Sequence, residues 1–248
     1  MRVTEAAREI PVIAEADLCV VGGSCTGVFA AVRAARLGLK VIIVEAENCF
    51  GGVATNAMVN IWHSLYDTNS RDQVIAGLTE EVIHLLKRRG AVDEKKRKLQ
   101  EHYVLNTEEL KIELDQLVMQ HRIQPFLHTL FVDAHVSEQS GQLEGIFVEN
   151  KDGRGVILAR AFVDATGDGD LAARLNLETY RGEQLQPGTT CAKISNLHAV
   201  ANFSELYREK REAYQLPETF IWSSRIPGEE NLFMLAASRI AFDMSNAE

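Results

Sequence analysis

The sequence contains little cysteine, and its cysteines form no metal-binding pattern. Its 248 residues include four, at Cys19, Cys25, Cys49 and Cys191. No two of them have the CxxC spacing or another spacing typical of zinc ligands. Nothing in this pattern resembles the disulfide framework of a small secreted domain. We therefore expect no metal site and a reducing, cytoplasmic environment.

Positive charge and long apolar runs are also scarce. The chain has 26 basic and 35 acidic residues, a net charge of −9, which argues against a surface for nucleic acid or anionic membranes. Basic residues do gather at 87–89 and 95–98, where a solvated helix end and loop is the favoured interpretation. No apolar run is long enough to span a membrane, and residues 1–17 lack the pattern of a signal peptide. We expect neither a nucleic-acid partner nor a membrane partner.

What is present begins with an ordinary globular composition, 46% hydrophobic and 25% charged, which suits one large domain or two unequal ones. The most informative stretch is residues 17–45. It is interpreted, in order, as a strand (18–21), a glycine-rich turn with the sequence GGSCTG (22–27), a helix (28–37) closed by Gly38, a second strand (40–44) and an acidic residue, Glu45. This order is typical of a βαβ dinucleotide site.

The residue types in this stretch suit a diphosphate and a ribose. Gly22 and Gly27 allow a tight turn and close helix–strand packing, and the helix amino terminus attracts phosphate. Glu45 is placed to accept hydrogen bonds from ribose hydroxyls. Ser24 replaces the usual second glycine, and its hydroxyl could donate to a phosphate oxygen, so we interpret the change as tolerated. The alternative is a βαβ unit that binds no nucleotide.

Two further motifs favour FAD. Gly51 and Gly52 lead the sequence GGVAT, and residues 161–170 read AFVDATGDGD. Together with GGSCTG, these motifs resemble those of the FAD-dependent oxidoreductases of the glutathione-reductase-like superfamily, over about residues 17–196. The resemblance implies bound FAD and leaves the substrate open.

The resemblance also implies a fold. We expect an α/β, Rossmann-like FAD-binding domain over residues 1–176, with a parallel sheet and an antiparallel β excursion. Residues 177–248 would begin a β-rich substrate or cap domain. Relatives continue beyond the point where this sequence stops, so we expect either a fragment or a shortened member of the family.

Position by position, the resemblance assigns residues to parts of the cofactor. Those at the pyrophosphate and ribose are Gly22, Gly23, Ser24, Cys25, Thr26, Gly27, Glu45 and Ala46. Those near the pyrophosphate or the flavin are Gly51, Gly52 and Thr55, while Val132 would contact adenine through its backbone. A turn beside the dinucleotide would be formed by Ala165, Thr166, Gly167 and Asp168.

Periodicity and turn residues predict the remaining elements. The expected helices are 71–89, a helix to residue 121 that Asn106 caps with Glu109 reaching back, and 204–214. The expected strands are 126–136, 143–149, 156–163 and 189–194, with a hairpin formed by 220–226 and 232–240.

Three residues are weak candidates for chemistry beyond the cofactor. Cys25 lies at a helix amino end, where the dipole favours a thiolate, yet a packed structural role is the favoured interpretation. His63 follows the glycine pair and could act as an acid or base, although a loop hydrogen bond is commoner. Arg239 could bind an anionic substrate or form an ordinary salt bridge.

Two absences narrow the reaction. No CxxxxC follows the second glycine pair, which disfavours thiol–disulfide chemistry, and no second GxGxxG lies between residues 107 and 166. We expect an FAD-dependent oxidoreductase that moves a hydride from a small organic substrate to FAD, with O₂ or an acceptor protein reoxidising it. The alternatives are a non-catalytic or truncated FAD- or nucleotide-binding fragment and a flavoenzyme of biosynthesis or modification. The sequence leaves the oligomeric state open.

Overall fold

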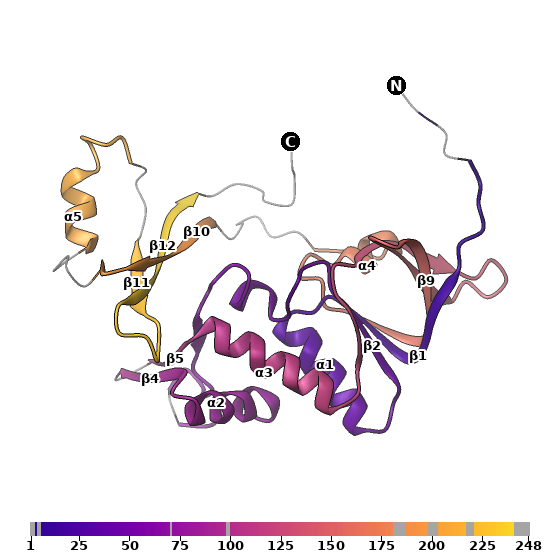
Figure 1. Cartoon of the computed structure of the whole chain (residues 1–248), viewed down its shortest axis with the longest axis horizontal. Helices are drawn as coiled ribbons and strands as arrows, with labels where there is room; N and C mark the ends of the chain where they lie inside the picture. The colour runs from indigo at the N-terminus through magenta and orange to yellow at the C-terminus, as the bar shows by residue number, and fades with distance from the viewer. Residues whose placement is uncertain are drawn as a thin grey trace. The chain divides into compact units, whose positions relative to one another are not determined.

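A computed structural model describes residues 3, 6–69, 71–97, 100–180, 187–197, 203–216 and 221–240. Its elements are mixed α and β, as expected (Figure 1). The chain divides into two compact units, each made of two segments. Unit 1 contains Met1–Phe50 and Asp115–Thr179, and unit 2 contains Gly51–Leu114 and Tyr180–Glu248. This division by packing groups residues 51–114 with the carboxyl-terminal segment. The functional division into residues 1–176 and 177–248 stays a prediction.

Unit 1 is built on a six-stranded sheet. Its strands, in spatial order, are β6 (Gln124–Phe126), β2 (Val41–Val44), β1 (Val12–Val21), β9 (Gly153–Asp164), β8 (Leu143–Asn150) and β7 (Leu130–Val136). β1, β2, β6 and β9 pair in parallel, whereas β7, β8 and β9 pair antiparallel. The sheet thus has the parallel core and the antiparallel excursion that the sequence predicted.

The interior of unit 1 follows from its residue types. All four residues of β2 are buried, which is typical of a parallel strand covered on both faces. α1 (Cys25–Arg36) buries small residues on one side, including Gly27, Ala31 and Ala34, so the helix can pack closely. The helix starts three positions before the predicted residue 28, because Ser24 serves as its amino-terminal cap. α4 (Asp170–Arg174) follows β9, and α3 (Thr107–Gln120) runs across the division between the units.

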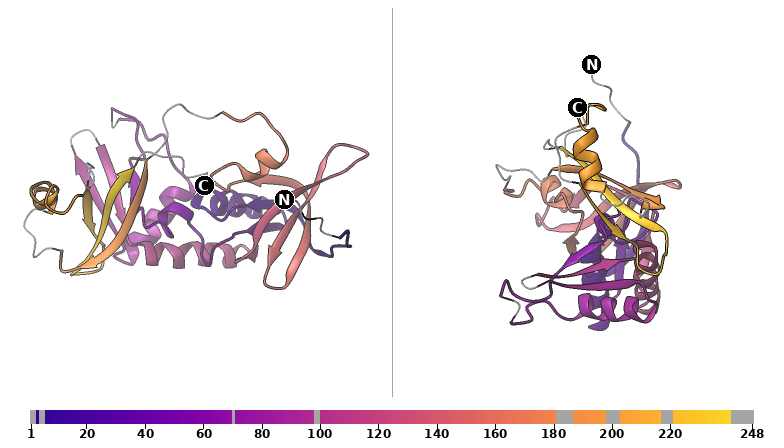
Figure 2. Two further views of the ribbon diagram at one scale, coloured as in Figure 1. Left: turned by 90° about the horizontal axis from the view of Figure 1, so that it is seen from above. Right: turned by 90° about the vertical axis from the view of Figure 1, so that its left-hand side faces the viewer.

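Unit 2 contains two three-stranded antiparallel sheets. One is formed by β3 (Ile61–His63), β5 (Gln100–Leu105) and β4 (Val92–Arg97), and the other by β10 (Gly188–Ser195), β12 (Leu232–Ile240) and β11 (Trp222–Arg225). Its helices are the 3₁₀ turn η1 (Gly52–Ala54), α2 (Leu78–Arg88) and α5 (Phe203–Lys210). Figure 2 shows β10, β11 and β12 side by side. The predicted hairpin of β11 and β12 is confirmed, while Phe220 lies outside the described residues.

In unit 2, the predicted start of one helix and the predicted loop at residues 95–97 were wrong. The helix expected over 71–89 begins only at Leu78, because residues 71–77 belong to a loop. In that loop the Asp67 carboxylate accepts hydrogen bonds from the N–H groups of Arg71 and Asp72, at 2.8 and 3.3 Å. Ile75, expected on a buried helical face, is 44% exposed. The basic residues 95–97 belong to β4 rather than to a loop, since β4 pairs along its length with β5.

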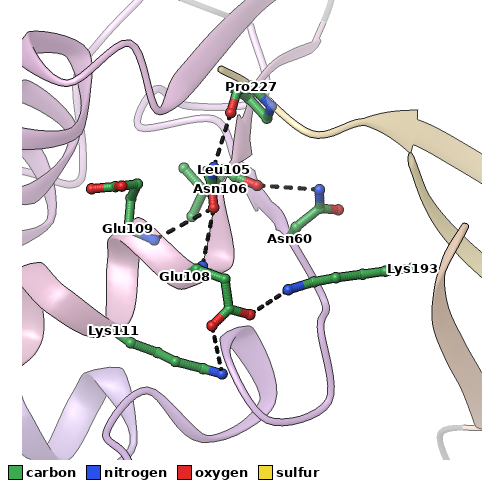
Figure 3. Close-up of polar contacts among 8 residues, drawn as sticks. All are labelled: Asn60, Leu105, Asn106, Glu108, Glu109, Lys111, Lys193 and Pro227. Carbon is green, nitrogen blue, oxygen red and sulfur yellow. Dashed lines mark hydrogen bonds and ion pairs between the residues drawn. The ribbon is translucent and has the colours of Figure 1, made fainter. Parts of the chain in front are cut away.

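Asn106 joins three parts of unit 2 (Figure 3). Its side-chain oxygen accepts from the N–H groups of Glu108 and Glu109, which confirms the predicted cap. Its side-chain nitrogen donates to the carbonyl of Pro227 at 3.0 Å. The reciprocal part of the predicted capping box was wrong, because the Asn106 N–H donates to Ala91 and a Glu109 oxygen accepts from Arg89.

Ion pairs of Glu108 and hydrogen bonds of the buried Asn60 side chain add further contacts near Asn106. A Glu108 oxygen pairs with Lys193 of β10, and its other oxygen pairs with Lys111 at 3.1 Å. The first of these contacts is the main cause that lowers the pKa of Glu108. Asn60 donates to the carbonyl of Leu105 at 3.2 Å and accepts from the hydroxyl of Ser224 at 3.1 Å. The hairpin that contains Pro227 is therefore hydrogen-bonded to the start of α3.

Candidate cofactor site

The candidate site lies in unit 1, where three parallel strands end together. The N–H of Gly22, just past β1, donates to the carbonyl of Val44 at 2.8 Å. The N–H of Ala165, just past β9, donates to the carbonyl of Val21 at 2.7 Å. The turns that follow β1, β2 and β9 therefore meet at one edge. In open α/β sheets, ligands bind at this carboxyl edge.

The glycine-rich turn has no room for side chains at three positions. Gly22 has φ +101°, and a Cβ there would lie 2.3 Å from the carbonyl oxygen of Ala165. A Cβ on Gly27 would lie 2.0 Å from the carbonyl oxygen of Gly22. A Cβ on Gly23 would lie 2.6 Å from the ring of Phe50. The structure thus confirms the tight turn and the close helix–strand contact predicted from the sequence.

Glu45 points back at this turn from the end of β2. One carboxylate oxygen accepts from the N–H of Gly23 at 2.6 Å, and the other accepts from the N–H of Glu47 at 2.8 Å. The side chain is partly buried, and Ala46 beside it is exposed. A carboxylate held by two backbone N–H groups beside a phosphate-type turn retains lone pairs for further donors, such as ribose hydroxyls.

The Ser24 hydroxyl forms two hydrogen bonds within the protein. Its hydroxyl accepts from the N–H of Gly27 at 3.2 Å and donates to the carbonyl of Ala165 at 3.2 Å. A serine has one hydroxyl hydrogen, which is used in the second of these bonds. Donation from this hydroxyl to a phosphate stays a prediction, because it depends on the bound cofactor.

Cys25 and Thr26 complete the turn at the start of α1. Burial raises the pKa of the Cys25 thiol to about 12, against the weaker opposing effect of a backbone hydrogen bond. A thiol with a raised pKa stays protonated near neutral pH, which favours the packed role of Cys25 over the thiolate. Thr26 is exposed.

The turn after β9 is organised by Asp164, which the sequence reasoning did not single out. Its carboxylate accepts from the N–H and hydroxyl of Thr166, at 3.2 and 2.8 Å, and from the N–H of Ala172 at 3.0 Å. The Thr166 hydroxyl in turn accepts from the N–H groups of Gly169 and Asp170, at 3.1 and 3.0 Å. The signal was available, because an aspartate at a strand end before Thr and Gly is typical of a capped turn. Gly167 has φ +92° with open space around it, and Asp168 is exposed.

The backbone of residues 127–129 runs beside Glu45 and was also missed. The N–H of Thr129 donates to the carbonyl of Glu45, and the N–H of His128 donates to that of Glu47, both at 3.0 Å. His128 has φ +49°, which breaks the strand predicted over 126–136 into β6 and β7. Val132, the predicted adenine contact, lies within β7 where its pairing register with β8 shifts. No sequence pattern marks this crossing segment.

The second glycine pair lies in unit 2. Gly51 and Gly52 have φ +110° and +53°, and they lead into the turn η1. A Cβ on Gly51 would lie 2.4 Å from the side chain of Thr55, which is only 1% exposed. The Thr55 hydroxyl donates to the carbonyl of Gly52 at 3.3 Å. The backbone conformation and close packing of Gly51 therefore require glycine, whereas the φ of Gly52 is one that His128 also adopts.

The other two candidates also lie in unit 2. His63 is exposed at the end of β3, directly opposite His102 of β5. Arg239 lies in β12, and its side chain is outside the described residues. Within the part of the chain that the structure describes, no three His, Cys, Asp or Glu side chains gather as a metal site. No helix among those residues is both long and apolar enough to cross a membrane.

Together, the fold and the site define an α/β protein with a dinucleotide-binding turn. The donor set fits FAD, because a glycine turn closed to side chains and a helix amino terminus suit a diphosphate, and Glu45 suits a ribose. A family model described as FAD dependent oxidoreductase matches residues 17–240. The chain belongs to this family, and its cofactor is FAD.

Individual relatives agree with this assignment at the level of sequence or fold. Mitochondrial dihydrolipoyl dehydrogenase of Schizosaccharomyces pombe is 37% identical over 84 residues, covering 29% of this chain and 16% of the dehydrogenase. A geranylgeranyl bacteriochlorophyll reductase-like protein from Thermoplasma acidophilum superposes with a TM-score of 0.58 and 13% identity, over 90% of this chain and 56% of that one. BexE, studied for oxidation during BE-7585A biosynthesis, superposes with a TM-score of 0.59 and 12% identity, over 90% of this chain and 44% of BexE. The chain thus spans about half the length of these two solved proteins.

Proposed function

We propose that this protein is a flavin-dependent oxidoreductase that removes a hydride from a carbon atom of a small organic substrate. Bound FAD supplies the chemistry by accepting that hydride at its isoalloxazine ring. The observation that carries the proposal is the meeting of the glycine-rich turn, Glu45 and the turn after β9 at one sheet edge. O₂ or an acceptor protein would reoxidise the flavin, in a cytoplasmic setting with no nucleic-acid or membrane partner.

Within this proposal, each part of the site has a task. The backbone N–H groups at the start of α1 would bind the diphosphate, and Glu45 would accept from the ribose. The backbone of Val132 in β7 is the candidate for contact with the adenine, as the family resemblance implies. Gly51, Gly52 and Thr55 are proposed for the flavin side, as the family resemblance implies. His63 and Arg239 remain candidates for contact with the substrate.

The first experiment is an absorbance spectrum of the purified chain, with the released cofactor identified by chromatography. We expect FAD in near-stoichiometric yield. An anaerobic screen of metabolite classes, monitored by bleaching of the flavin band, then tests the reaction. A flavin that dithionite reduces but no metabolite does would favour the non-catalytic alternative, and a product without net redox change would favour a modifying flavoenzyme.

Glu45→Ala is expected to weaken FAD binding by about 1–3 kcal/mol, or roughly 5- to 150-fold in Kd. The variant removes an acceptor for the ribose and also the contact of the carboxylate with the Gly23 N–H. Fluorescence titration of the FAD-free protein measures the change. Glu47→Ala is the matched control, since it removes the same charge two positions on but keeps the N–H that pairs with Glu45. Equal affinity of Glu45→Ala and the unmodified chain would show that Glu45 does not bind the ribose.

A further inference from the structure

We propose that Ser24 is a positioning residue, which ties the glycine-rich turn to the turn after β9 and so forms the diphosphate site before FAD arrives. The inference rests on the FAD binding described above, not on the substrate or the reaction. In the motif, position 24 is the second glycine, whose usual value is to leave space for the cofactor. Here a side chain occupies it and is used for contacts within the protein.

The geometry of the hydroxyl carries the inference. It accepts from the N–H of Gly27 and donates to the carbonyl of Ala165, each at 3.2 Å. The first bond holds the start of α1, and the second spans 141 positions of sequence to the turn after β9. Neither glycine nor alanine at position 24 could form either bond.

The backbone explains why, of the three glycine positions of the motif, position 24 is the one that accepts a serine. Ser24 has φ −57° and ψ 169°, a conformation that ordinary residues adopt without strain. Gly22 and Gly27, by contrast, would each place a Cβ within 2.3 Å of a carbonyl oxygen. The chain thus keeps glycine where a side chain would collide and uses serine where a side chain forms bonds. Serine is also among the preferred helix-capping residues.

This arrangement changes how the site binds. Because the only hydroxyl hydrogen of Ser24 points to Ala165, the diphosphate is left to the backbone N–H groups at the start of α1. The glycine-rich turn and the turn after β9 are thus already joined in the FAD-free protein. Binding then requires less ordering of the two turns, and a preorganised site binds more tightly for the same contacts.

The test compares Ser24→Ala, Ser24→Gly and Ser24→Thr as FAD-free proteins. We expect the first two to raise the Kd for FAD by about 5- to 20-fold, as for loss of a capping bond and a tertiary bond. Hydrogen–deuterium exchange should rise at Gly27 and at residues 164–167 together. Ser24→Thr retains a hydroxyl and is expected to restore both the exchange protection and the affinity.

Asp17→Ala is the control for a merely structural role. The Asp17 carboxylate accepts from the N–H of Lys40 at 2.9 Å, at the amino end of β2, the end of that strand opposite the site. It should lower the thermal midpoint without changing the affinity for FAD. Three results would overturn the proposal: equal loss of affinity in Asp17→Ala, FAD binding by Ser24→Gly as tight as in the unmodified chain, or faster exchange at Gly27 alone. A chain that binds FAD but is reduced by no substrate would instead count against the proposed function and leave this comparison intact.

Discussion

Gly22→Ala is expected to abolish retention of FAD and to destabilise unit 1 by roughly 2–6 kcal/mol. The estimate adds about 1–3 kcal/mol of backbone strain to about 1–3 kcal/mol of overpacking. Strain arises because φ is +101°, and overpacking arises because the new Cβ would lie 2.3 Å from the Ala165 carbonyl oxygen. That contact is with backbone, which no change of side-chain rotamer can relieve. Chemical denaturation and the flavin absorbance of the purified variant measure the two effects.

Gly38→Ala is the matched control for this substitution. Gly38 follows α1 in the same unit and has φ +90°, yet a Cβ there would meet nothing within 4 Å. The control therefore includes the strain of positive φ without the collision, and should cost about 1–2 kcal/mol while FAD binding is kept. If the two variants lose equal stability and both retain FAD, the close approach of the two turns does not matter to the site.

Asn106→Ala is expected to lower the free energy of unfolding by about 1.5–5 kcal/mol. Loss of a helix cap costs about 0.5–2 kcal/mol, and a buried carbonyl left without its donor costs about 1–3 kcal/mol. Both apply, because the Asn106 side chain caps α3 and donates to Pro227, and the residue is 9% exposed. Denaturant unfolding followed by circular dichroism measures the change.

Asn106→Ser separates the two contributions. Serine caps a helix about as well as asparagine, but its shorter side chain carries one hydroxyl and cannot reproduce both contacts. We expect Asn106→Ser to regain the stability that the helix cap provides. The stability lost with the hydrogen bond to Pro227 should stay lost. A loss below about 0.5 kcal/mol in Asn106→Ala, the lower bound for a cap alone, would contradict the structural account of this residue.

The sequence predicted the cofactor site better than its surroundings. Gly22, Gly27 and Glu45 were predictable because a βαβ turn demands particular residues at particular positions, and the structure places them at one edge as expected. Asn106 was predictable as a cap for the same local reason. The predicted FAD contacts themselves stay predictions, because they depend on the bound cofactor.

What escaped prediction depends on partners distant in sequence. The charged residues of β4 look like a solvated loop until their pairing with β5 is known. The hydroxyl of Ser24 could have faced a phosphate, and only the position of the Ala165 carbonyl shows where its hydrogen goes. Burial likewise raises the pKa of the Cys25 thiol, and that effect of packing is not visible from its position at a helix amino end in the sequence.

The pairing of β1 with a strand so late in the chain sets an order of events during synthesis. β1 can pair with β2 soon after both leave the ribosome, but its other neighbour, β9, ends at Asp164. At about 5–20 residues per second, the interval from Ser24 to Ala165 lasts roughly 7–28 s. Until then the glycine-rich turn has β2 beside it but lacks the turn after β9. FAD can therefore bind to both turns only after β9 has been synthesised, because the contact between the turns joins residues far apart in the sequence.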